Sequence, residues 1–414
     1  MRTPLIVQFF RRNLPGLLLC LVASTAPAAD WPRWRGPDLN GVSAETNWFR
    51  PWPNDGPPVL WRARVGIGFA TVSVSQGYLY TLGNSNDVDT VFCLDAATGR
   101  ERWRHSYPCA LDARSYEGGP CATPTVEGEA VYTFSKKGHL FRLDAATGRS
   151  VWAKNLPNEL DLKLPEWSLA GSPLVEGDLL ILNAGSAGTA VDKHTGRIVW
   201  TSGPGPGGYA TPVPFGHQGR RAIAIFSAKA LVAVEPRTGR EWWRHPWESS
   251  RDVNAADPLI AGDKLFISSS SGCALLQLRD GPPTVLWNHT KRMRNYFNPT
   301  VLLDGHLYAI DGTTHQSTTL TCLDWATGQL RWSEPGFGSG GLIAADGKLI
   351  VFDKGQLSLV RAAPGAFQLL ARAQVLDGKC WTAPVLSHGR IYVRNADGDL
   401  ACVAADGLPP KPQP

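Results

Sequence analysis

Hydrophobic and polar residues alternate in short stretches along most of the chain, and glycine-bearing turns separate these stretches. Examples are ATPTVEGEAVYTF from residue 122, GSPLVEGDLLIL from residue 171 and TAPVLSHGRIYV from residue 382. A period of two residues is typical of half-buried β-strands, and short turns with glycine join such strands into antiparallel hairpins. The pattern therefore predicts an all-β protein.

A second pattern follows the hairpins and ends in tryptophan. LDAATGRERW at 94–103 recurs, with changes, at 143–152, 191–200, 234–243 and 323–332, and a degenerate copy ends at Trp287. The repeated tryptophans stand 42 to 49 residues apart, at Trp61, Trp103, Trp152, Trp200, Trp243, Trp287 and Trp332. Repeats of roughly this length with four strands each are typical of a β-propeller. We expect an eight-bladed β-propeller of four-stranded antiparallel blades; seven blades are the alternative.

The strand count places the ring closure at the N-terminal end of the repeats. The seventh unit, about 338–374, has lost its Thr-Gly pair and its tryptophan, and the eighth runs out of chain after three strands. The stretch PPVLWRARV at 57–65 can supply the fourth strand, which closes the ring and removes its free edges. The propeller is thus expected over 57–408, between an N-terminal arm at 30–56 and a flexible tail at 409–414.

Each repeated turn carries a carboxylate and a glycine at fixed positions. An aspartate that opens a turn can accept hydrogen bonds from the turn's backbone amides, and glycine takes a positive φ without strain. Catalysis or calcium binding is the alternative for a carboxylate present in every unit. The residues assigned to structural turns are Asp95, Gly99, Asp144, Gly148, Asp192, Gly196, Gly239, Asp324 and Gly328.

The first 29 residues have the composition of an export signal. Arg2, Arg11 and Arg12 accompany the apolar run LPGLLLCLVA, and small residues follow, so cleavage is expected near Ala29. Arg11-Arg12 leaves a twin-arginine signal open, and Cys20 leaves lipidation open. The sequence contains no run of the ~18 to 20 apolar residues that a transmembrane helix needs. We expect an exported protein, periplasmic or extracellular, with no transmembrane segment.

Charge and cysteine content narrow the classes of function. Removing the three signal arginines takes the formal net charge from +5 to +2, so the mature chain offers no broad basic field and no nucleic-acid partner is expected. The cysteines show no zinc-binding spacing. Cys109 and Cys121 flank one loop and are the candidates for a disulfide, which an exported protein permits.

The least repetitive residues lie in the segments that lead from one unit into the first strand of the next. These segments converge at one mouth of the central channel, where a rigid scaffold can present a ligand site. The predicted ligand-binding residues are Tyr116, Trp167, Tyr209, Arg251, Arg294, Tyr296 and Trp381, with Arg114 and Arg292 as further cations.

The aromatic residues suit stacking on a planar, carbohydrate or peptide ligand, and the arginines suit an anionic group. The alternatives are that the aromatic rings pack on the adjacent blade and that the arginines are solvated or paired with Glu117, Glu248 or Asp252. Glu117 and Asp252 could instead form a catalytic pair.

The LDAATGRxxW repeats resemble those of the pyrroloquinoline-quinone-like (PQQ-like) propeller repeat proteins, over nearly the whole mature chain. The opening WPRWRGPDLNGVS resembles the start of a subgroup of exported members. The family includes quinoprotein dehydrogenases, and also a lipoprotein propeller that assists outer-membrane protein assembly and is similar to this chain in length and blade number. The resemblance therefore implies either an oxidoreductase with quinone and calcium or a binding module without them.

Comparison with these two groups favours the binding module. Dehydrogenases of the methanol dehydrogenase type hold the quinone against two adjacent cysteines and surround calcium with Glu, Asn and Asp, whereas this chain has no Cys-Cys pair and no convincing calcium triad. We expect a monomeric scaffold for a cell-envelope protein or polymer, with no PQQ, calcium or other metal and no catalytic residues. A quinoprotein-type oxidoreductase, or another enzyme that uses the channel mouth, is the alternative.

The segment DWPRWRGPDLNGVSAETNW, residues 30–48, fits neither a strand nor a helix. Because it comes shortly before the closing strand, its expected path lies across the outer rim or one face of blades eight and one. We expect Trp31, Trp34 and Trp48 to be packing anchors that hold this arm on the ring; ligand binding is the alternative.

Overall fold

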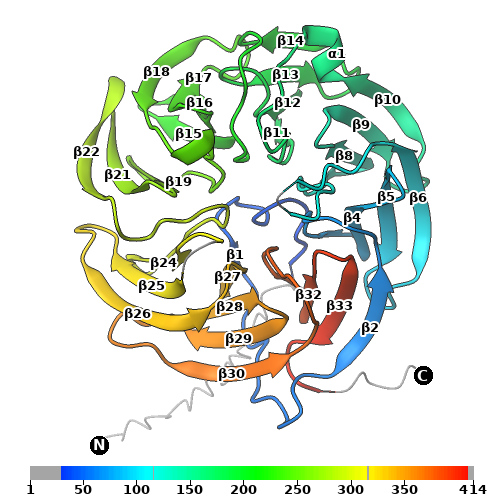
Figure 1. Cartoon of the computed structure of the whole chain (residues 1–414), viewed down its shortest axis with the longest axis vertical. Helices are drawn as coiled ribbons and strands as arrows, with labels where there is room; N and C mark the ends of the chain where they lie inside the picture. The colour runs from blue at the N-terminus through cyan, green and yellow to red at the C-terminus, as the bar shows by residue number, and fades with distance from the viewer. Residues whose placement is uncertain (1–28, 115, 315–316, 409–414) are drawn as a thin grey trace, which may run out of the picture.

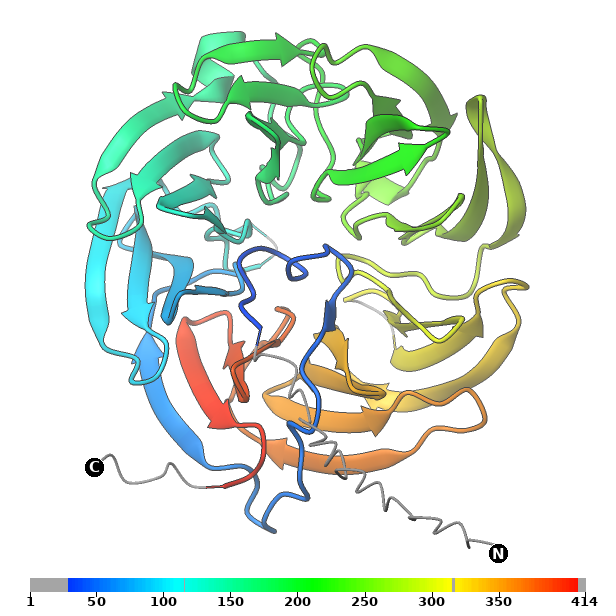
Figure 2. The ribbon, with the colours of Figure 1, turned by 180° about the vertical axis from the view of Figure 1, so that it is seen from behind.

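The structure is a computed structural model that describes residues 29–114, 116–314 and 317–408. Residues 1–28 of the predicted signal peptide and the predicted tail, 409–414, lie outside the described residues. Eight sheets stand around a common centre (Figures 1 and 2). The prediction of an all-β, eight-bladed propeller is confirmed, and the seven-bladed alternative is wrong.

Each blade has four strands, called A to D from the centre of the ring outward. Blade one is β3 (Ser73–Ser75), β4 (Tyr78–Ser85), β5 (Val88–Asp95) and β6 (Glu101–Pro108). Blade two is β7 (Thr125–Glu127), β8 (Ala130–Phe134), β9 (His139–Asp144) and β10 (Ser150–Asn155). Blade three is β11 (Leu174–Glu176), β12 (Leu179–Leu182), β13 (Thr189–Asp192) and β14 (Ile198–Thr201). Blade four is β15 (Val213–His217), β16 (Arg220–Phe226), β17 (Ala230–Val234) and β18 (Glu241–Pro246).

The second half of the ring continues in the same order. Blade five is β19 (Leu259–Ala261), β20 (Lys264–Ser269), β21 (Gly272–Arg279) and β22 (Gly281–His289). Blade six is β23 (Val301–Leu303), β24 (His306–Asp311), β25 (Thr318–Asp324) and β26 (Leu330–Phe337). Blade seven is β27 (Gly341–Ala345), β28 (Lys348–Asp353), β29 (Gln356–Arg361) and β30 (Leu369–Gln374). Two short helical turns, α1 (Leu156–Leu160) and η1 (Ser250–Asp252), interrupt the connections between blades.

Blade eight is built from both ends of the repeat region. Strands β31 (Val385–Ser387), β32 (Arg390–Arg394) and β33 (Asp399–Ala404) come from the C-terminal end, and β2 (Val59–Arg64) pairs antiparallel with β33 as its outer strand. Trp61 lies opposite Cys402 in this pairing. The predicted ring closure by an N-terminal strand is therefore confirmed.

The repeated tryptophan locks each blade to the next one. Trp103, on strand D of blade one, donates its indole N–H to the Ala145 carbonyl in the C–D turn of blade two (2.9 Å), and its ring lies over Gly148 of that turn. A Cβ on Gly148 would stand 2.4 Å from the ring, so the close approach needs glycine. The same indole-to-carbonyl bond joins Trp61 to Ala96, Trp152 to Lys193, Trp200 to Pro236, Trp287 to Trp325 and Trp332 to Ala363.

Two junctions depart from this rule. Blade seven has no repeat tryptophan, but Trp52 of the arm takes its place. Its indole donates to the Ala405 carbonyl (3.2 Å) and packs on Gly407, and these two residues of blade eight serve as the carbonyl and the glycine of the turn do in the other blades. Between blades four and five, Trp243 makes no such bond: its indole N–H has no hydrogen-bond partner among the described residues. Blade five has a short C–D turn around Asp280 in place of the usual Thr-Gly turn.

The turn carboxylates act within their own turns. Asp95 Oδ1 accepts hydrogen bonds from the Ala97 and Thr98 amides and from the Thr98 hydroxyl. Asp144, Asp192 and Asp324 make the corresponding contacts, and Glu235 takes the same part in blade four. The glycines Gly99, Gly148, Gly196, Gly239 and Gly328 all have φ between 69° and 73°. These contacts fully account for the repeated pattern in structural terms.

The A strands are joined around the channel by a belt of side-chain oxygens. The Thr71 amide donates to Thr123 Oγ1, the Thr123 amide to Ser172 Oγ, and the Ser172 amide to Thr211 Oγ1, over 2.9 to 3.2 Å. Blade five continues the belt with a carboxylate, because the Thr211 amide donates to Asp257 Oδ1 (2.7 Å).

The N-terminal arm crosses the centre of the ring, where it is visible as the blue segment in Figures 1 and 2. The Trp31 amide donates to the Val74 carbonyl of blade one, and the Val74 amide donates to the Trp31 carbonyl, both at 2.8 Å. The Val126 amide of blade two donates to the Pro32 carbonyl, also at 2.8 Å. Farther along, β1 (Val42–Ser43) joins blade seven as a fifth, parallel strand on the inner edge of β27. The arm therefore contacts strands that line the channel.

This path corrects one prediction and bears out another. The expected path over blades eight and one was too narrow, because the arm also contacts blades two, six and seven through backbone groups and blade five through the Asp257 side chain, and the repeat pattern encodes none of these contacts. The prediction that the tryptophans are packing anchors is confirmed: Trp31 and Trp48 are 2% and 4% exposed, and Trp34 donates to Asp257 Oδ2 (2.5 Å).

The predicted Cys109–Cys121 disulfide is not present; both residues are free thiols. The Cys109 main chain is fixed by the Asp87 carbonyl and the Asn84 side chain, whereas the Cys121 thiol donates to the Gly119 carbonyl. Each cysteine is thus held by its own set of partners. Within the described part of the chain, no helix is long and apolar enough to cross a membrane.

Candidate functional site

The connections from strand D to the next strand A gather aromatic side chains at one end of the channel. Tyr116 lies 6.2 Å from Trp167 and 5.4 Å from Phe69, measured between ring centroids. Phe69 in turn lies 5.4 Å from Trp381 in a stacked arrangement. These residues come before blades one, two, three and eight, so the contacts join loops from different parts of the sequence.

The aromatic chain continues on the far side of the mouth. Phe297 lies 5.1 Å from Trp381 and 5.6 Å from Tyr296. We call the six residues Phe69, Tyr116, Trp167, Tyr296, Phe297 and Trp381 the aromatic mouth. All six are half-buried, so each keeps part of its side chain accessible.

Tyr209 is buried next to the aromatic mouth and fixes the main chain of Trp167. Its side chain is 7% exposed, and its hydroxyl accepts a hydrogen bond from the Trp167 amide (3.2 Å). Burial raises the pKa of Tyr209 to about 12, so the phenol remains neutral at physiological pH. Of the predicted aromatic ligand residues, Tyr209 is therefore a positioning group for Trp167, while the other four belong to the mouth surface.

Cations flank the aromatic mouth on two sides. The Lys379 ammonium lies 4.5 Å from the Trp381 ring centroid and pairs with Glu117 (2.7 Å). The Arg251 guanidinium lies 5.9 Å from the Trp167 ring and pairs with Glu166 (3.4 Å). Both cations thus stay close to an aromatic face and remain at the surface.

The other predicted arginines are placed differently. Arg294 pairs with Asp311 of β24 (3.3 Å), which holds it against blade six, and Arg114 pairs with Asp112 in its own loop (2.9 Å). Arg292 is exposed. The structure brings most of the predicted aromatic residues together, whereas the predicted arginines Arg114, Arg251 and Arg294 lie in three separate ion pairs.

Three residues of this site were missed by the sequence reasoning. Phe69, Phe297 and Lys379 occupy the same inter-blade connections as the residues that were named. Phe69 precedes the first strand of blade one just as Trp381 precedes that of blade eight, and this shared position was the available signal.

The donor set at the mouth does not fit a quinone with calcium. Such a pair needs several carboxylate and amide oxygens around one cation. Glu117 and Glu166 are each engaged by a basic side chain, and no group of three or more His, Cys, Asp or Glu side chains suited to a metal occurs in the described ranges. Glu117, one of the two residues considered as a catalytic pair, is engaged by the Lys379 ammonium.

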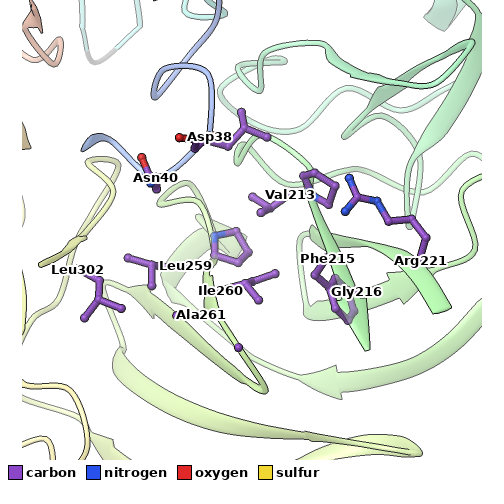
Figure 3. A pocket seen from close by; sticks show the side chains of 14 residues that line it. Asp38, Asn40, Val213, Phe215, Gly216, Arg221, Leu259, Ile260, Ala261 and Leu302 are labelled. Atoms are coloured by element: carbon purple, nitrogen blue, oxygen red, sulfur yellow. The ribbon is translucent and has the colours of Figure 1, made fainter. Parts of the chain in front are cut away.

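A cavity of about 390 Å³ lies near the opposite end of the channel, beneath the arm (Figure 3). Asp38 and Asn40 of the arm close one side, and Val213, Phe215 and Leu259 of blades four and five form apolar walls. Arg221, at its edge, is held by both carboxylate oxygens of Glu176 (2.6 and 2.9 Å). The cavity therefore combines polar and apolar walls and offers one cation that is already paired.

The channel beside the arm contains two buried ionisable groups, Arg35 and Asp257. Arg35 is 4% exposed and donates to the Thr300 carbonyl (2.7 Å). Burial raises the pKa of Asp257 to about 6, although Arg35, the Thr211 amide and the Trp34 indole all favour its charged form. These groups hold the arm in the channel and form no open site.

Solved structures share this architecture at low sequence identity. A quinohemoprotein alcohol dehydrogenase from Comamonas testosteroni is 15% identical, with a TM-score of 0.69, and the match covers 94% of this chain and 83% of that one. BamB from Moraxella catarrhalis is 16% identical, with a TM-score of 0.61 and coverage of 83% and 96%. A europium-containing methanol dehydrogenase is 14% identical, with a TM-score of 0.68 and coverage of 88% and 89%. These likenesses establish the fold alone.

Sequence comparison identifies the family. No curated protein matches the chain. The family model described as outer membrane protein assembly factor BamB matches residues 53–166, 114–334 and 316–408. Together these segments span 53–408, nearly the whole ring, and so the chain belongs to this family of PQQ-like β-propeller repeat proteins.

Proposed function

We propose that this protein is an exported, monomeric, non-enzymatic binding module that holds a cell-envelope protein or polymer at the aromatic mouth without bound quinone. The observation that carries the proposal is the aromatic mouth itself. Six half-buried aromatic residues from five inter-blade connections lie in continuous contact, with Lys379 and Arg251 beside them. Aromatic surfaces of this kind supply large contact area at low conformational cost.

The pairing of the charged groups supports binding over catalysis. A general acid or base needs a titratable side chain directed at substrate, with its pKa tuned to its task. At this mouth Glu117 and Glu166 are occupied by Lys379 and Arg251. The description of the matching family, an outer membrane protein assembly factor, is consistent with a protein ligand and with a place in the cell envelope.

The test compares capture by the wild-type mature chain with capture by a Trp167→Ala/Trp381→Ala variant from cell-envelope extract. We expect the variant to retain at most a tenth of the specific ligand while keeping its unfolding midpoint close to that of the wild type. Tyr78→Ala, which removes a half-buried aromatic ring outside the mouth, is the matched control and should capture the ligand normally. Equal capture by all three proteins would refute the mouth as the binding site.

The oxidoreductase alternative has its own readout. Mature protein is incubated with PQQ and calcium, its absorbance spectrum is recorded after desalting, and dye-linked oxidation of alcohols and sugars is measured. We expect no retained chromophore and no turnover. A stoichiometric chromophore together with turnover would replace the binding module with a quinoprotein-type enzyme.

A further inference from the structure

The junction between blades four and five has an open tryptophan-docking position. At seven of the eight junctions an indole N–H donates to a carbonyl in the next blade's turn region, and Trp52 serves where blade seven lacks its own tryptophan. At the remaining junction, the strand pairing of blade five continues to Arg279 opposite Gly281, leaving only a tight turn at Asp280. This turn is too short to reach over Trp243 as the Thr-Gly turns reach over the other tryptophans.

A groove of about 640 Å³ lies at this position, on the face that carries the C–D turns. Trp242 and Trp243 form its aromatic wall, and Arg220, Arg240 and Arg279 line it from both blades. Its location is distinct from the aromatic mouth, which is built from the D–A connections.

The groove has hydrogen-bond donors that the protein itself does not use. Among the residues that the structure describes, the Trp243 indole N–H donates to no acceptor. The ring nitrogens Trp242 Nε1 and His217 Nε2 are buried without a partner in the same part of the chain. Elsewhere in the ring the corresponding indole meets a main-chain carbonyl at 2.8 to 3.2 Å. The missing acceptor is therefore a peptide carbonyl by analogy with seven observed cases.

The charges in the groove favour an acidic ligand. Arg220 and Arg240 form no ion pair in the described structure, and the Arg220 guanidinium stacks 4.0 Å above the Trp242 ring. Of the two acidic residues that line the groove, Asp280 is bound by the Gln218 amide and Glu241 pairs with Arg244 (2.7 Å). The cations are thus the groups left available for a carboxylate.

We propose that this groove binds an acidic β-turn of a partner protein, which takes the place of the missing Thr-Gly turn of blade five. The turn's main-chain carbonyl accepts the Trp243 indole N–H, its glycine lies on the indole face, and flanking carboxylates meet Arg220 and Arg240. The chain's own turns show that such a segment fits a tryptophan of this ring, because Gly148 and Ala145 make these two contacts with Trp103.

The probe is a cyclic peptide that contains Glu-Asp-Ala-Ala-Thr-Gly-Glu, whose central five residues copy residues 144–148. Binding to the full mature chain is measured by fluorescence anisotropy of a labelled peptide at low salt. We expect saturable binding in the micromolar range. It should weaken at least tenfold with Arg220→Glu/Arg240→Glu, about fivefold with Trp243→Phe, and at least tenfold when glutamine and asparagine replace the acidic residues of the peptide.

The controls are equivalent positions at the junction between blades one and two, where the Trp103 indole has its acceptor. Arg149 occupies the same place in its repeat as Arg240, so Arg149→Glu should leave peptide binding unchanged. Trp103→Phe and Trp243→Phe both shorten a buried ring, but Trp103→Phe should lower the unfolding midpoint more than Trp243→Phe, because only Trp103 also loses a hydrogen bond.

Three results would overturn the proposal. They are absence of binding at millimolar peptide, equal binding by the wild type and the arginine variant, and conversion of a wild-type dimer to a monomer by Arg220→Glu/Arg240→Glu in sedimentation velocity. The last result would assign the groove to a second copy of the chain. Each is independent of capture at the aromatic mouth, so the proposed function can fail or stand separately.

Discussion

At the scale of single residues, the fold depends on a contact between tryptophan and glycine that recurs between blades. The indole ring covers a glycine with positive φ, and the indole N–H meets a carbonyl of the same turn. This contact explains why the sequence repeats Thr-Gly and tryptophan together. The tryptophan of one unit and the glycine of the next form one structural element.

Gly148→Ala should destabilise the protein more than alanine at a turn glycine with open space around it. Both Gly148 (φ 71°) and the control Gly128 (φ 55°) are in the left-handed region, which costs an alanine about 1 to 2 kcal/mol. Only at Gly148 would the new Cβ also meet the Trp103 ring, and such overpacking adds about 1 to 3 kcal/mol. Urea unfolding of both variants measures the difference; equal losses would show that the ring moves aside.

Asp257 should give the protein a pH-dependent stability between about pH 4 and pH 6. Its pKa is raised by burial from 3.8 to about 6, so over this window the folded state binds more protons than the unfolded state and stability falls as pH rises. Asp257→Asn removes this titration, while Arg35 stays charged throughout the window. The stability of the variant relative to the wild type should therefore increase from pH 4 to pH 6 and level off above it. Denaturant unfolding at each pH checks this slope, and a constant difference would contradict it.

At the scale of elements, the blades could be predicted from the sequence and the arm could not. Alternation and the repeat determine where strands begin and end, and even blade seven was found without its Thr-Gly pair and tryptophan. The arm makes its main contacts with backbone groups, such as the Val74 and Thr300 carbonyls, which leave no mark on side-chain patterns. For the same reason β1 was not foreseen.

The candidate site was predictable in part. The inter-blade connections identified most of the aromatic mouth, because departures from a repeat are visible in one sequence. Ion pairs such as Lys379 with Glu117 join positions 262 residues apart and depend on where the loops settle in space. The open junction at Trp243 could not be predicted either. The sequence shows that the repeat of blade five is degenerate, but the loss of an acceptor for Trp243 depends on how blade five packs beside blade four.

Deleting residues 30–50 should lower the unfolding temperature, because the arm buries Trp31 and Trp48 and satisfies inner-strand groups of several blades. Removing even one buried tryptophan typically costs about 3 to 5 kcal/mol. Trp52 remains in this deletion, so its bond to Ala405 is retained. Differential scanning calorimetry of the deletion, with Arg50→Ala as a control at an exposed position, measures the effect. An unchanged midpoint would show that the arm only rests on the ring.

At the scale of the whole molecule, stability depends on keeping the ring closed. Strand β2 joins the N-terminal side of the repeats to β33, and Arg394 of blade eight donates to the Ala70, Leu82 and Gly66 carbonyls of blade one. Burial lowers the pKa of Arg394 to about 10, so this link stays charged at physiological pH. Two different interactions therefore secure the one seam where the chain is not continuous.

A disulfide across this seam, between β2 and β33, should stabilise the protein more than one between two strands that are adjacent in sequence. Arg64 and Asp399 are register partners on β2 and β33, both are accessible, and their ion pair (3.5 Å) contributes little at the surface. Arg64→Cys/Asp399→Cys would close a loop of more than three hundred residues, whereas the matched pair Thr90→Cys/Ser106→Cys, on β5 and β6, closes a short one. Loop-closure entropy predicts about 5 to 6 kcal/mol for the first and about 3 kcal/mol for the second. Guanidinium unfolding with and without reductant measures both. If the two disulfides stabilise the protein equally, closing the longer loop in the unfolded chain adds nothing to the stability of the ring.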